Sequence, residues 1–296
     1  MRVAIVCLAA LISIFIMQAE NRALIVGIGR YPVYTGWSEI HGDADVDLLV
    51  PALKKNGYGD IDRKSDIMTL KNSEATKTAI IKELNALAGR CSAGDKVYFH
   101  FSGHGQPVAD MNGDEGSKGF DEAIVPYDAC KTITTKVKGR FYNGESHLID
   151  DELNPLFAAI KEKLGAKGEL FIAIDACYSD DMERASDTEE AELPQTRGTN
   201  ETLNVKRTAA WTSISKPKPY SIGAKMYVVS ACKSDERNFE YKAKNGKTYG
   251  SLSYFIYSLM RSTMDFNKWV TRIETKTPSF PAIFYKHQHP QKRIYM

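Results

Sequence analysis

Two short apolar runs, each followed by chemically reactive residues, constrain this chain more than any other feature. The run at 97–101 precedes Ser-Gly-His-Gly, and the run at 170–174 precedes Asp-Ala-Cys-Tyr-Ser. Runs of this length and composition predict strands that are buried on both faces of a parallel sheet. Open α/β sheets place their ligand sites at the carboxyl ends of the strands. We therefore expect His104 and Cys177 to lie at one edge of such a sheet.

The rest of the chain alternates between strand-like apolar runs and apolar residues at helical spacing. Further strands are predicted at 23–28, 67–70, 123–126 and 227–231, and helices at 43–56, 73–88, 150–164, 251–264 and about 267–273. This alternation predicts an α/β fold in which a mainly parallel sheet is flanked by helices on both faces. A polar stretch at about 180–225 interrupts the pattern and is predicted to be a mobile insert.

The amino terminus has the layout of a signal peptide. Arg2 precedes an uncharged apolar stretch at 3–17, and Ala19 supplies a small residue for cleavage. The stretch is shorter than the roughly 20 residues of a membrane-spanning helix, which is the alternative reading. We expect residues 1–19 to be a signal peptide and residues 20–296 to be an exported domain, periplasmic or secreted, with no membrane span.

The charge and cysteine content narrow the function classes. The net charge of +2 offers no support for a nucleic-acid partner, which usually meets a concentrated basic face. Four cysteines remain after removal of the signal peptide: Cys91, Cys130, Cys177 and Cys232. An even number permits disulfides in an exported chain, but the spacing shows no disulfide framework. Cys177 is expected to be a free thiol, and the state of the other three is left open.

The residues at the predicted sheet edge suit nucleophilic catalysis. Cysteine attacks carbonyl groups as a thiolate, and His104 could take the proton of Cys177 and pass it to a leaving amine. The backbone N–H groups of Gly105 and Cys177 could stabilise an oxyanion. The alternative for Cys177 is a small buried apolar side chain. No third catalytic residue is evident from the sequence, and His41 fits either the cleft or a solvated loop.

The motifs of this chain, taken in order, resemble those of the metacaspase group of caspase-like cysteine peptidases. The matching stretches begin at Leu24, Ile40, Tyr98, Gly119, Ile149, Asp175, Ser230 and Tyr249 and span roughly residues 21–285. The resemblance implies a caspase-like three-layer sandwich and a cysteine endopeptidase with His104 and Cys177 as its catalytic dyad. Tyr178 and Asp180 depart from the usual His and Gly of that group.

The resemblance also implies a preference for arginine or lysine before the cleaved bond. The substrate-binding positions would be Asp45, Ser102 and Asp175, and carboxylates there would attract a basic side chain. Each aspartate has a structural alternative. Asp175 could hydrogen-bond the N–H groups of its own loop, and Asp45 could stabilise a helix amino terminus.

Calcium is a further implication of the resemblance, with Asp121, Asp150 and Asp151 as candidate ligands. The loop at 110–114 also has alternating oxygen side chains, but Glu115 stands where a calcium loop needs glycine. The alternative is a solvated acidic loop with a helix cap at Asp150.

The sequence hypothesis is therefore a monomeric cysteine endopeptidase that cleaves after Arg or Lys in a peptide or protein substrate. It needs no cofactor for the chemistry itself, and Ca²⁺ activation is left open. Basic residues of the insert offer sites for self-cleavage: Arg184, Arg197, Lys206, Arg207, Lys216 and Lys218. Two alternatives stay open. One is an inactive caspase-like module that binds a protein partner, and the other is a caspase-type enzyme with Asp specificity, although no basic pocket is found for it.

Overall fold

The structure is a computed structural model that describes most of the chain outside its first residues. The described residues are 19–59, 67–116, 119–178, 194–206, 208, 220, 223–274 and 288–296. The predicted signal peptide therefore lies outside them, apart from Ala19. Across these ranges, no helix has both the length and the apolar character needed to span a membrane.

A six-stranded sheet forms the centre of the molecule, in the strand order β13-β10-β9-β3-β1-β2. The strands are β1 (Asn21–Gly27), β2 (Ile67–Lys71), β3 (Lys96–Ser102), β9 (Glu169–Asp175), β10 (Lys225–Ser230) and β13 (Gln291–Tyr295). All neighbours pair in parallel except β13, which runs antiparallel to β10 at one edge. The mainly parallel sheet is confirmed, whereas β13 carries too many charged residues for the sequence to have indicated a strand.

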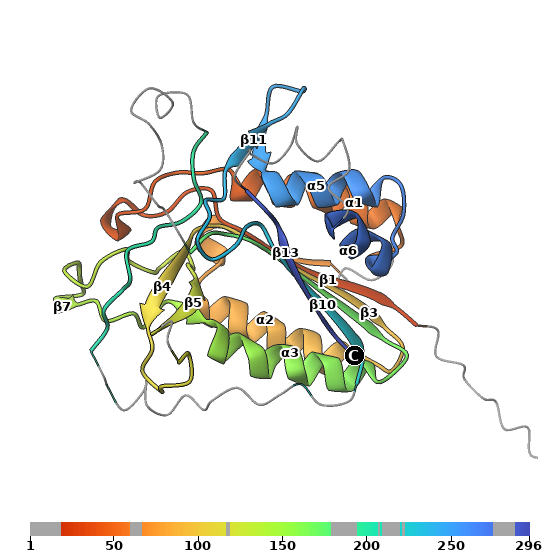
Figure 1. Ribbon diagram of the computed structural model, residues 1–296, viewed down its shortest axis with the longest axis horizontal. Coiled ribbons are helices and arrows are strands. Elements are labelled where there is room, and N and C mark those ends of the chain that lie inside the picture. Colours follow the sequence, from red (N-terminus) through yellow and green to blue (C-terminus); the bar gives the residue numbers. More distant parts are fainter. Residues whose placement is uncertain are drawn as a thin grey trace, which may run out of the picture.

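Helices cover both faces of this sheet, as the alternation predicts (Figure 1). On one face lie α1 (Gly42–Lys55), α5 (Ser251–Met260) and α6 (Phe266–Glu274), and on the other lie α2 (Lys77–Arg90) and α3 (Asp150–Leu164). Each face has its own apolar core, because strand side chains alternate between the two faces. In α2, for example, Ile80, Leu84 and Leu87 are buried at helical spacing. The α/β three-layer sandwich is confirmed.

Several short elements gather beyond the carboxyl ends of the central strands, at the left and at the top of the molecule in Figure 1. A small antiparallel sheet contains β4 (Gly105–Ala109), β5 (Phe120–Ile124) and β8 (Leu148–Ile149). Two hairpins pair β6 (Lys136–Val137) with β7 (Arg140–Phe141) and β11 (Glu240–Lys242) with β12 (Thr248–Gly250). The 3-10 turns are η1 (Val33–Thr35) and η2 (Asn72–Glu74). These elements surround the candidate site together with the carboxyl ends of the central strands.

Part of the predicted mobile insert is packed against the domain. Within residues 194–206, Arg197 is fully buried, and Leu203 and Val205 are buried in an apolar cluster with Val108 of β4. The structure thus packs this segment of the predicted mobile insert against the domain. It does so because the few apolar residues and the one arginine of the segment have partners that lie far away in the sequence. Residues 179–193, 207, 209–219 and 221–222 of the insert lie outside the described residues.

The core on the α6 side gives a prediction about stability. Trp269 of α6 is fully buried, and its ring packs edge-on against Phe171 at 5.2 Å and Tyr98 at 6.2 Å. We expect Trp269→Ala to lower the free energy of unfolding by about 3–5 kcal/mol, since it leaves a large cavity. Urea denaturation would measure this loss. Tyr34→Ala, at a half-exposed side chain, should change the value by less than about 0.5 kcal/mol. If Trp269→Ala lost as little stability as the control Tyr34→Ala, the packing of Trp269 described above would be contradicted.

Candidate active site

The backbone brings the predicted catalytic residues together at one edge of the sheet. Strands β3 and β9 are neighbours, and Ser102 pairs with Asp175 at the end of both. His104 and Cys177 each lie two residues beyond the ends of these strands. A Cβ atom placed on Gly105 would lie 2.4 Å from the carbonyl oxygen of Cys177, so the two loops touch there. Glycine at position 105 is thus required for this close approach.

The imidazole of His104 is buried and held in one orientation. Its Nε2 lies 2.9 Å from the carbonyl oxygen of Ser38. A carbonyl oxygen can only accept, so Nε2 carries the proton, and Nδ1 of the neutral ring carries the lone pair. The ring stacks on Trp37 with centroids 4.8 Å apart, and the backbone N–H of His104 donates to the hydroxyl of Tyr31. Sequence reasoning missed Ser38, because a backbone carbonyl leaves no signal in the side chains.

The environment of His104 keeps the ring neutral. Burial lowers the pKa of His104 to about 4, although the hydrogen bond to Ser38 opposes this shift. Nδ1 is buried and has no hydrogen-bond partner among the residues that the structure describes. A neutral imidazole with an available lone pair can act as a proton acceptor.

The thiol of Cys177 is buried beside a second thiol. Its Sγ donates to the carbonyl oxygen of Glu236 at 2.8 Å, and the Sγ of Cys232 lies 3.5 Å away. All four described cysteines are free thiols, including Cys91 and Cys130, whose state the sequence left open. In this conformation the thiol proton of Cys177 is directed at Glu236.

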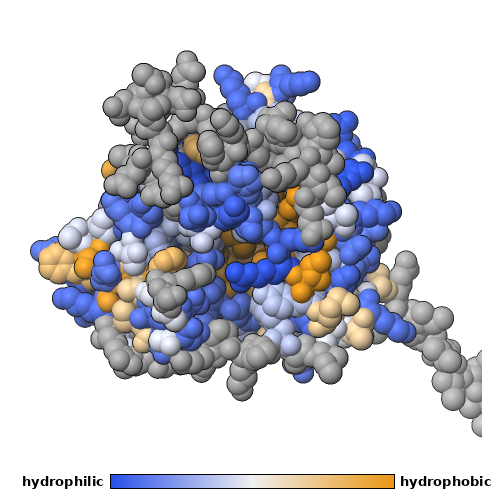
Figure 2. Space-filling view, viewed as in Figure 1, coloured by the Kyte–Doolittle hydropathy of each residue, from blue (hydrophilic) through white to orange (hydrophobic). Residues whose placement is uncertain are grey.

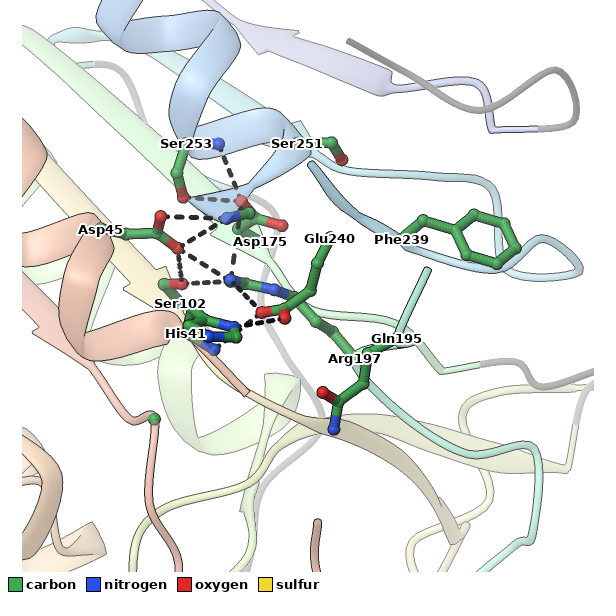
Figure 3. A network of polar contacts seen from close by, with 12 residues as sticks. His41, Asp45, Ser102, Asp175, Gln195, Arg197, Phe239, Glu240, Ser251 and Ser253 are labelled. Carbon is green, nitrogen blue, oxygen red and sulfur yellow. Dashed lines mark hydrogen bonds and ion pairs between the residues drawn. The ribbon is translucent and has the colours of Figure 1, made fainter. Parts of the chain in front are cut away.

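The three predicted substrate-binding residues surround a side chain of the protein itself. Nη1 of Arg197 lies 2.9 Å from Oδ2 of Asp45 and 2.5 Å from Oγ of Ser102 (Figure 3). The carboxylate of Asp175 is more distant, at 3.9 Å. Glu240 of β11 completes the pocket, with its Oε1 2.9 Å from Nη2. Sequence patterns did not single out Glu240, because its partner Arg197 lies in a segment predicted to be mobile.

The two pocket aspartates differ in how they are held. Asp45 accepts hydrogen bonds from the hydroxyl of Ser102 and the backbone N–H of Gly250. Asp175 accepts from the amide of Asn238 and from both the N–H and the hydroxyl of Ser253. Its oxygens are thus already satisfied within the protein, and Asp175 serves chiefly as a rigid wall of the pocket.

The charges of the pocket depend on one another. Burial raises the pKa of Asp45 to about 6, and the guanidinium of Arg197 opposes this shift. Burial alone would lower the pKa of Arg197, but the carboxylates of Asp45, Asp175 and Glu240 raise it above its ordinary value. The guanidinium is therefore held as a cation in a site with no exposed surface.

The backbone around Arg197 crosses the site as an added strand. The N–H of Arg197 donates to the carbonyl oxygen of Asn238 at 3.0 Å, and the N–H of Glu240 donates to Gln195 at 2.9 Å. Thr196 and Phe239 form an antiparallel bridge between these two bonds. Residues 195–197 therefore pair with residues 238–240, the segment that ends at the first residue of β11.

The peptide bond after Arg197 lies directly over the cysteine. The N–H of Cys177 donates to the carbonyl oxygen of Arg197 at 2.8 Å. A Cβ atom on Gly198 would lie 2.0 Å from the carbonyl oxygen of Cys177, so only glycine fits there. Beyond it, the N–H of Thr199 donates to the carbonyl oxygen of Gly105 at 3.3 Å. In an extended strand the N–H and C=O of one residue face the same side, so the N–H of Gly105 faces this segment too.

The three predicted metal ligands also lie together. Asp121 of β5 and Asp150 and Asp151 at the start of α3 offer carboxylate oxygens that lie within 4.8 Å of one another. One buried oxygen of each has no hydrogen-bond partner among the described residues. Burial, with neighbouring carboxylates adding to it, raises the pKa of Asp121 to about 8 and that of Asp150 to about 7. Unpaired buried carboxylate oxygens suit a calcium ion, which binds oxygen ligands.

An open hollow lies beside the cysteine but does not contain it. It has a volume of about 450 Å³ and lies among α3, β9, β10 and β13, with Cys232 and Tyr178 in its wall. Figure 2 shows an apolar recess near the middle of this face, where Figure 1 places β10 and β13. Cys177 is not in its lining. The backbone of residues 197–199 lies against Cys177 and Gly105 instead.

Comparison with known proteins connects this geometry to a family. A family model described as "Metacaspase, peptidase C14 domain" matches residues 21–184. Metacaspase-2 of Arabidopsis thaliana is 30% identical over 169 residues, which are 55% of this chain and 35% of that protein. Metacaspase-1A of Aspergillus niger is 27% identical over 168 residues, which are 54% and 36%. The aligned residues thus span about a third of the length of these relatives.

A solved structure supports the fold. Protein GSU0716 from Geobacter sulfurreducens matches with a TM-score of 0.60 over 93% of both chains. At 17% sequence identity, this likeness concerns the fold alone.

The acidic cluster predicts how stability changes with pH in the absence of metal ions. A carboxyl group whose pKa is raised by folding contributes its full stabilisation at pH values below its unfolded pKa of about 3.9. This contribution is lost as the pH rises from that value to the pKa of the folded state. For Asp121 the loss spans about pH 4 to about pH 8. In EDTA we expect Asp121→Asn to melt near the wild-type temperature at pH 4 and several degrees above it at pH 8.5.

The control for this prediction is an aspartate in solvent. Asp47→Asn removes a side chain that is 71% exposed and should show no such gain at pH 8.5. Equal melting temperatures of Asp121→Asn and wild type at pH 8.5 would show that Asp121 is not destabilised by its neighbours.

Proposed function

Because this chain belongs to the metacaspase family, we propose that it is a cysteine endopeptidase that cleaves peptide bonds after basic residues. One observation carries the proposal. The chain's own Arg197 fills a buried pocket of carboxylates while its carbonyl oxygen rests on the N–H of Cys177. This is the position that a substrate would need for attack by the Cys177 sulfur.

In the proposed mechanism, Cys177 is the nucleophile and His104 the general base. The thiol leaves its hydrogen bond to Glu236 and gives its proton to Nδ1 of His104, which Ser38 orients through Nε2. The thiolate attacks the substrate carbonyl, and the N–H groups of Cys177 and Gly105 hold the oxyanion. His104 then protonates the departing amine, and water hydrolyses the thioester.

The pocket supports a basic residue before the cleaved bond. Its buried acids, Asp45, Asp175 and Glu240, surround the position that the guanidinium of Arg197 takes (Figure 3). An aspartate side chain there would add a further negative charge in a buried site, which is strongly unfavourable. The geometry thus argues against the caspase-type Asp specificity. The substrate backbone would pair with residues 238–240 as Gln195 and Arg197 do, which is recognition by strand addition.

The same geometry supports self-cleavage at the Arg197–Gly198 bond. The segment binds on both sides of that bond, with Arg197 in the pocket and Leu203 in the apolar cluster beside β4. While intact, it occupies the groove that another substrate would need. Cleavage would free residues 194–197 to leave, and the pocket would then be open to substrates.

Calcium is the metal that the acidic cluster fits. Asp121, Asp150 and Asp151 would hold it, since each has a buried oxygen without a partner among the described residues. A bound Ca²⁺ would neutralise these carboxylates and tie β5 to the start of α3. Because β5 pairs with β4, which begins at Gly105, this tie would also steady the predicted oxyanion site.

The dyad predicts which variants lose activity. Cys177→Ala and His104→Ala should each reduce hydrolysis of an Arg-ended fluorogenic peptide by at least about a thousandfold, because nucleophile or base is gone. Cys91→Ala, at a thiol that follows α2, is the matched control and should keep its activity. Circular dichroism and melting temperature would confirm that the variants fold.

Self-cleavage can be measured in the same preparations of the wild-type chain and its variants. Mass spectrometry should find a new amino terminus at Gly198 in the active chain and none in Cys177→Ala or Arg197→Gln. If Cys177→Ala stays fully active, the assignment of the nucleophile is wrong. If the wild-type chain neither cleaves peptides nor reacts with an Arg-ended thiol-reactive probe at any calcium level, it is a binding module instead.

The calcium proposal predicts binding that strengthens with pH. Isothermal titration calorimetry should detect Ca²⁺ binding with release of protons between pH 6 and pH 8, since Asp121 and Asp150 must lose theirs. Asp121→Ala should weaken binding by about tenfold or more, because a charged ligand is lost. Glu162→Gln, on the exposed side of α3, should leave it unchanged. Undiminished affinity in Asp121→Ala would place the ion elsewhere.

A further inference from the structure

We propose that Glu240 makes the pocket selective for arginine over lysine by binding the second terminal nitrogen of the guanidinium. The inference deepens the proposed function and rests on it, because it concerns the residue before the cleaved bond. It follows from the way the pocket divides the guanidinium of Arg197 between different parts of the chain.

The two terminal nitrogens of Arg197 are bound by separate groups. Nη1 contacts Asp45 of α1 and Ser102 of β3, whereas Nη2 contacts Oε1 of Glu240 on β11 at 2.9 Å (Figure 3). The side chains of Arg197 and Asp45 are fully buried, and that of Glu240 is 2% exposed. Water therefore does not screen these contacts, and each is a charge-assisted hydrogen bond between fixed partners.

His41 holds Glu240 in place for this contact. The backbone N–H of His41 donates to Oε1 at 2.7 Å, and Nδ1 of His41 lies 2.6 Å from Oε2. Both oxygens are thus tied to the residue that precedes α1, and Oε1 keeps a lone pair for Nη2. The carboxylate is oriented before a substrate arrives, so binding does not require its side chain to be ordered.

A lysine could not make both contacts. Its ammonium is a single point of charge, whereas the planar guanidinium presents two nitrogens in a rigid fork. An ammonium that reached Asp45 and Ser102 would occupy the Nη1 position and leave Glu240 paired with His41 alone. Asp175 could not compensate, because Asn238 and Ser253 already use its oxygens. Lysine would therefore lose one buried charge-assisted bond that arginine makes.

The backbone of Glu240 also contacts the backbone of the bound segment. Its N–H donates to the carbonyl oxygen of Gln195, two residues before the arginine. The same residue thus contacts the main chain of the bound segment and the tip of its basic side chain. Removing the carboxylate should weaken recognition of the guanidinium while the backbone contact remains.

The test compares two fluorogenic peptides that differ only in Arg or Lys before the cleaved bond. In calcium, and with cleavage of the Arg197–Gly198 bond verified by mass spectrometry in every preparation, the wild-type enzyme should have a kcat/KM for Arg at least about tenfold above that for Lys, the worth of one charge-assisted hydrogen bond. Glu240→Gln should lower the Arg value by about tenfold and the Lys value much less, so that the preference nearly disappears. Glu240→Asp, which keeps the charge but shortens the side chain, should fall between the two.

Two further variants separate selectivity from a structural role. Asp45→Asn should lower kcat/KM for both peptides, because either basic side chain needs that carboxylate. Glu169→Gln, in a pair with Lys96 at the other end of β9, should change neither. His41→Ala, which releases Glu240 without removing it, should reduce the Arg preference in part. This variant keeps the test open if Glu240→Gln fails to fold by circular dichroism.

The outcomes distinguish this inference from the proposed function. Selective loss with the Arg peptide supports the role of Glu240. Equal losses with both peptides in Glu240→Gln, or equal activities in the wild-type enzyme, would overturn it and leave the peptidase assignment intact. If the wild-type chain cleaves neither peptide, the proposed function fails and this inference fails with it.

Discussion

The buried guanidinium of Arg197 is the interaction on which the arrangement of the site depends. An ion removed from water costs several kcal/mol unless opposite charges and hydrogen bonds replace its hydration. Here Asp45, Ser102 and Glu240 supply those partners at 2.5–2.9 Å. They come from α1, β3 and β11, so a single cation joins elements that lie far apart in the sequence. The pocket and its occupant are each stable in this form because the other is present.

This mutual dependence accounts for the resting state of the site. The segment that carries Arg197 is held at one end by charge and at the other by the burial of Leu203 and Val205. Between them, the carbonyl oxygen of Arg197 accepts a hydrogen bond from the N–H of Cys177, while the thiol of Cys177 donates to the carbonyl oxygen of Glu236. In the proposed mechanism this arrangement is a restrained form of the site. The thiol of Cys177 must turn away from Glu236 before it can attack.

The acidic cluster at Asp121, Asp150 and Asp151 presents the opposite electrostatic situation. In the pocket, negative charges surround a cation and raise its pKa. In the cluster, carboxylates face one another with no described cation among them, and burial and mutual repulsion raise their own pKa values. The cluster includes Asp121 of β5, which pairs with β4, and the segment that carries Arg197 also pairs with β4 through Thr199 and Leu203. A cation at the cluster and a basic side chain in the pocket would therefore act on the same short strands.

The sequence by itself determined the layers of the fold and the edge where the chemistry lies. Apolar runs of strand length and apolar residues at helical spacing are local patterns, so they located β3, β9 and the helix at 150–164. The alternation of strands and helices along the chain then predicted that the strands pair in parallel. That pairing placed His104 beside Cys177, and the family-like motifs indicated Asp45, Ser102 and Asp175. Only the tertiary structure decided what the pocket holds and what orients the imidazole. The contact of Ser38 is made by a backbone carbonyl, and those of Glu240 and Arg197 join residues distant in sequence. Such contacts depend on how separately formed elements meet, which no local pattern encodes.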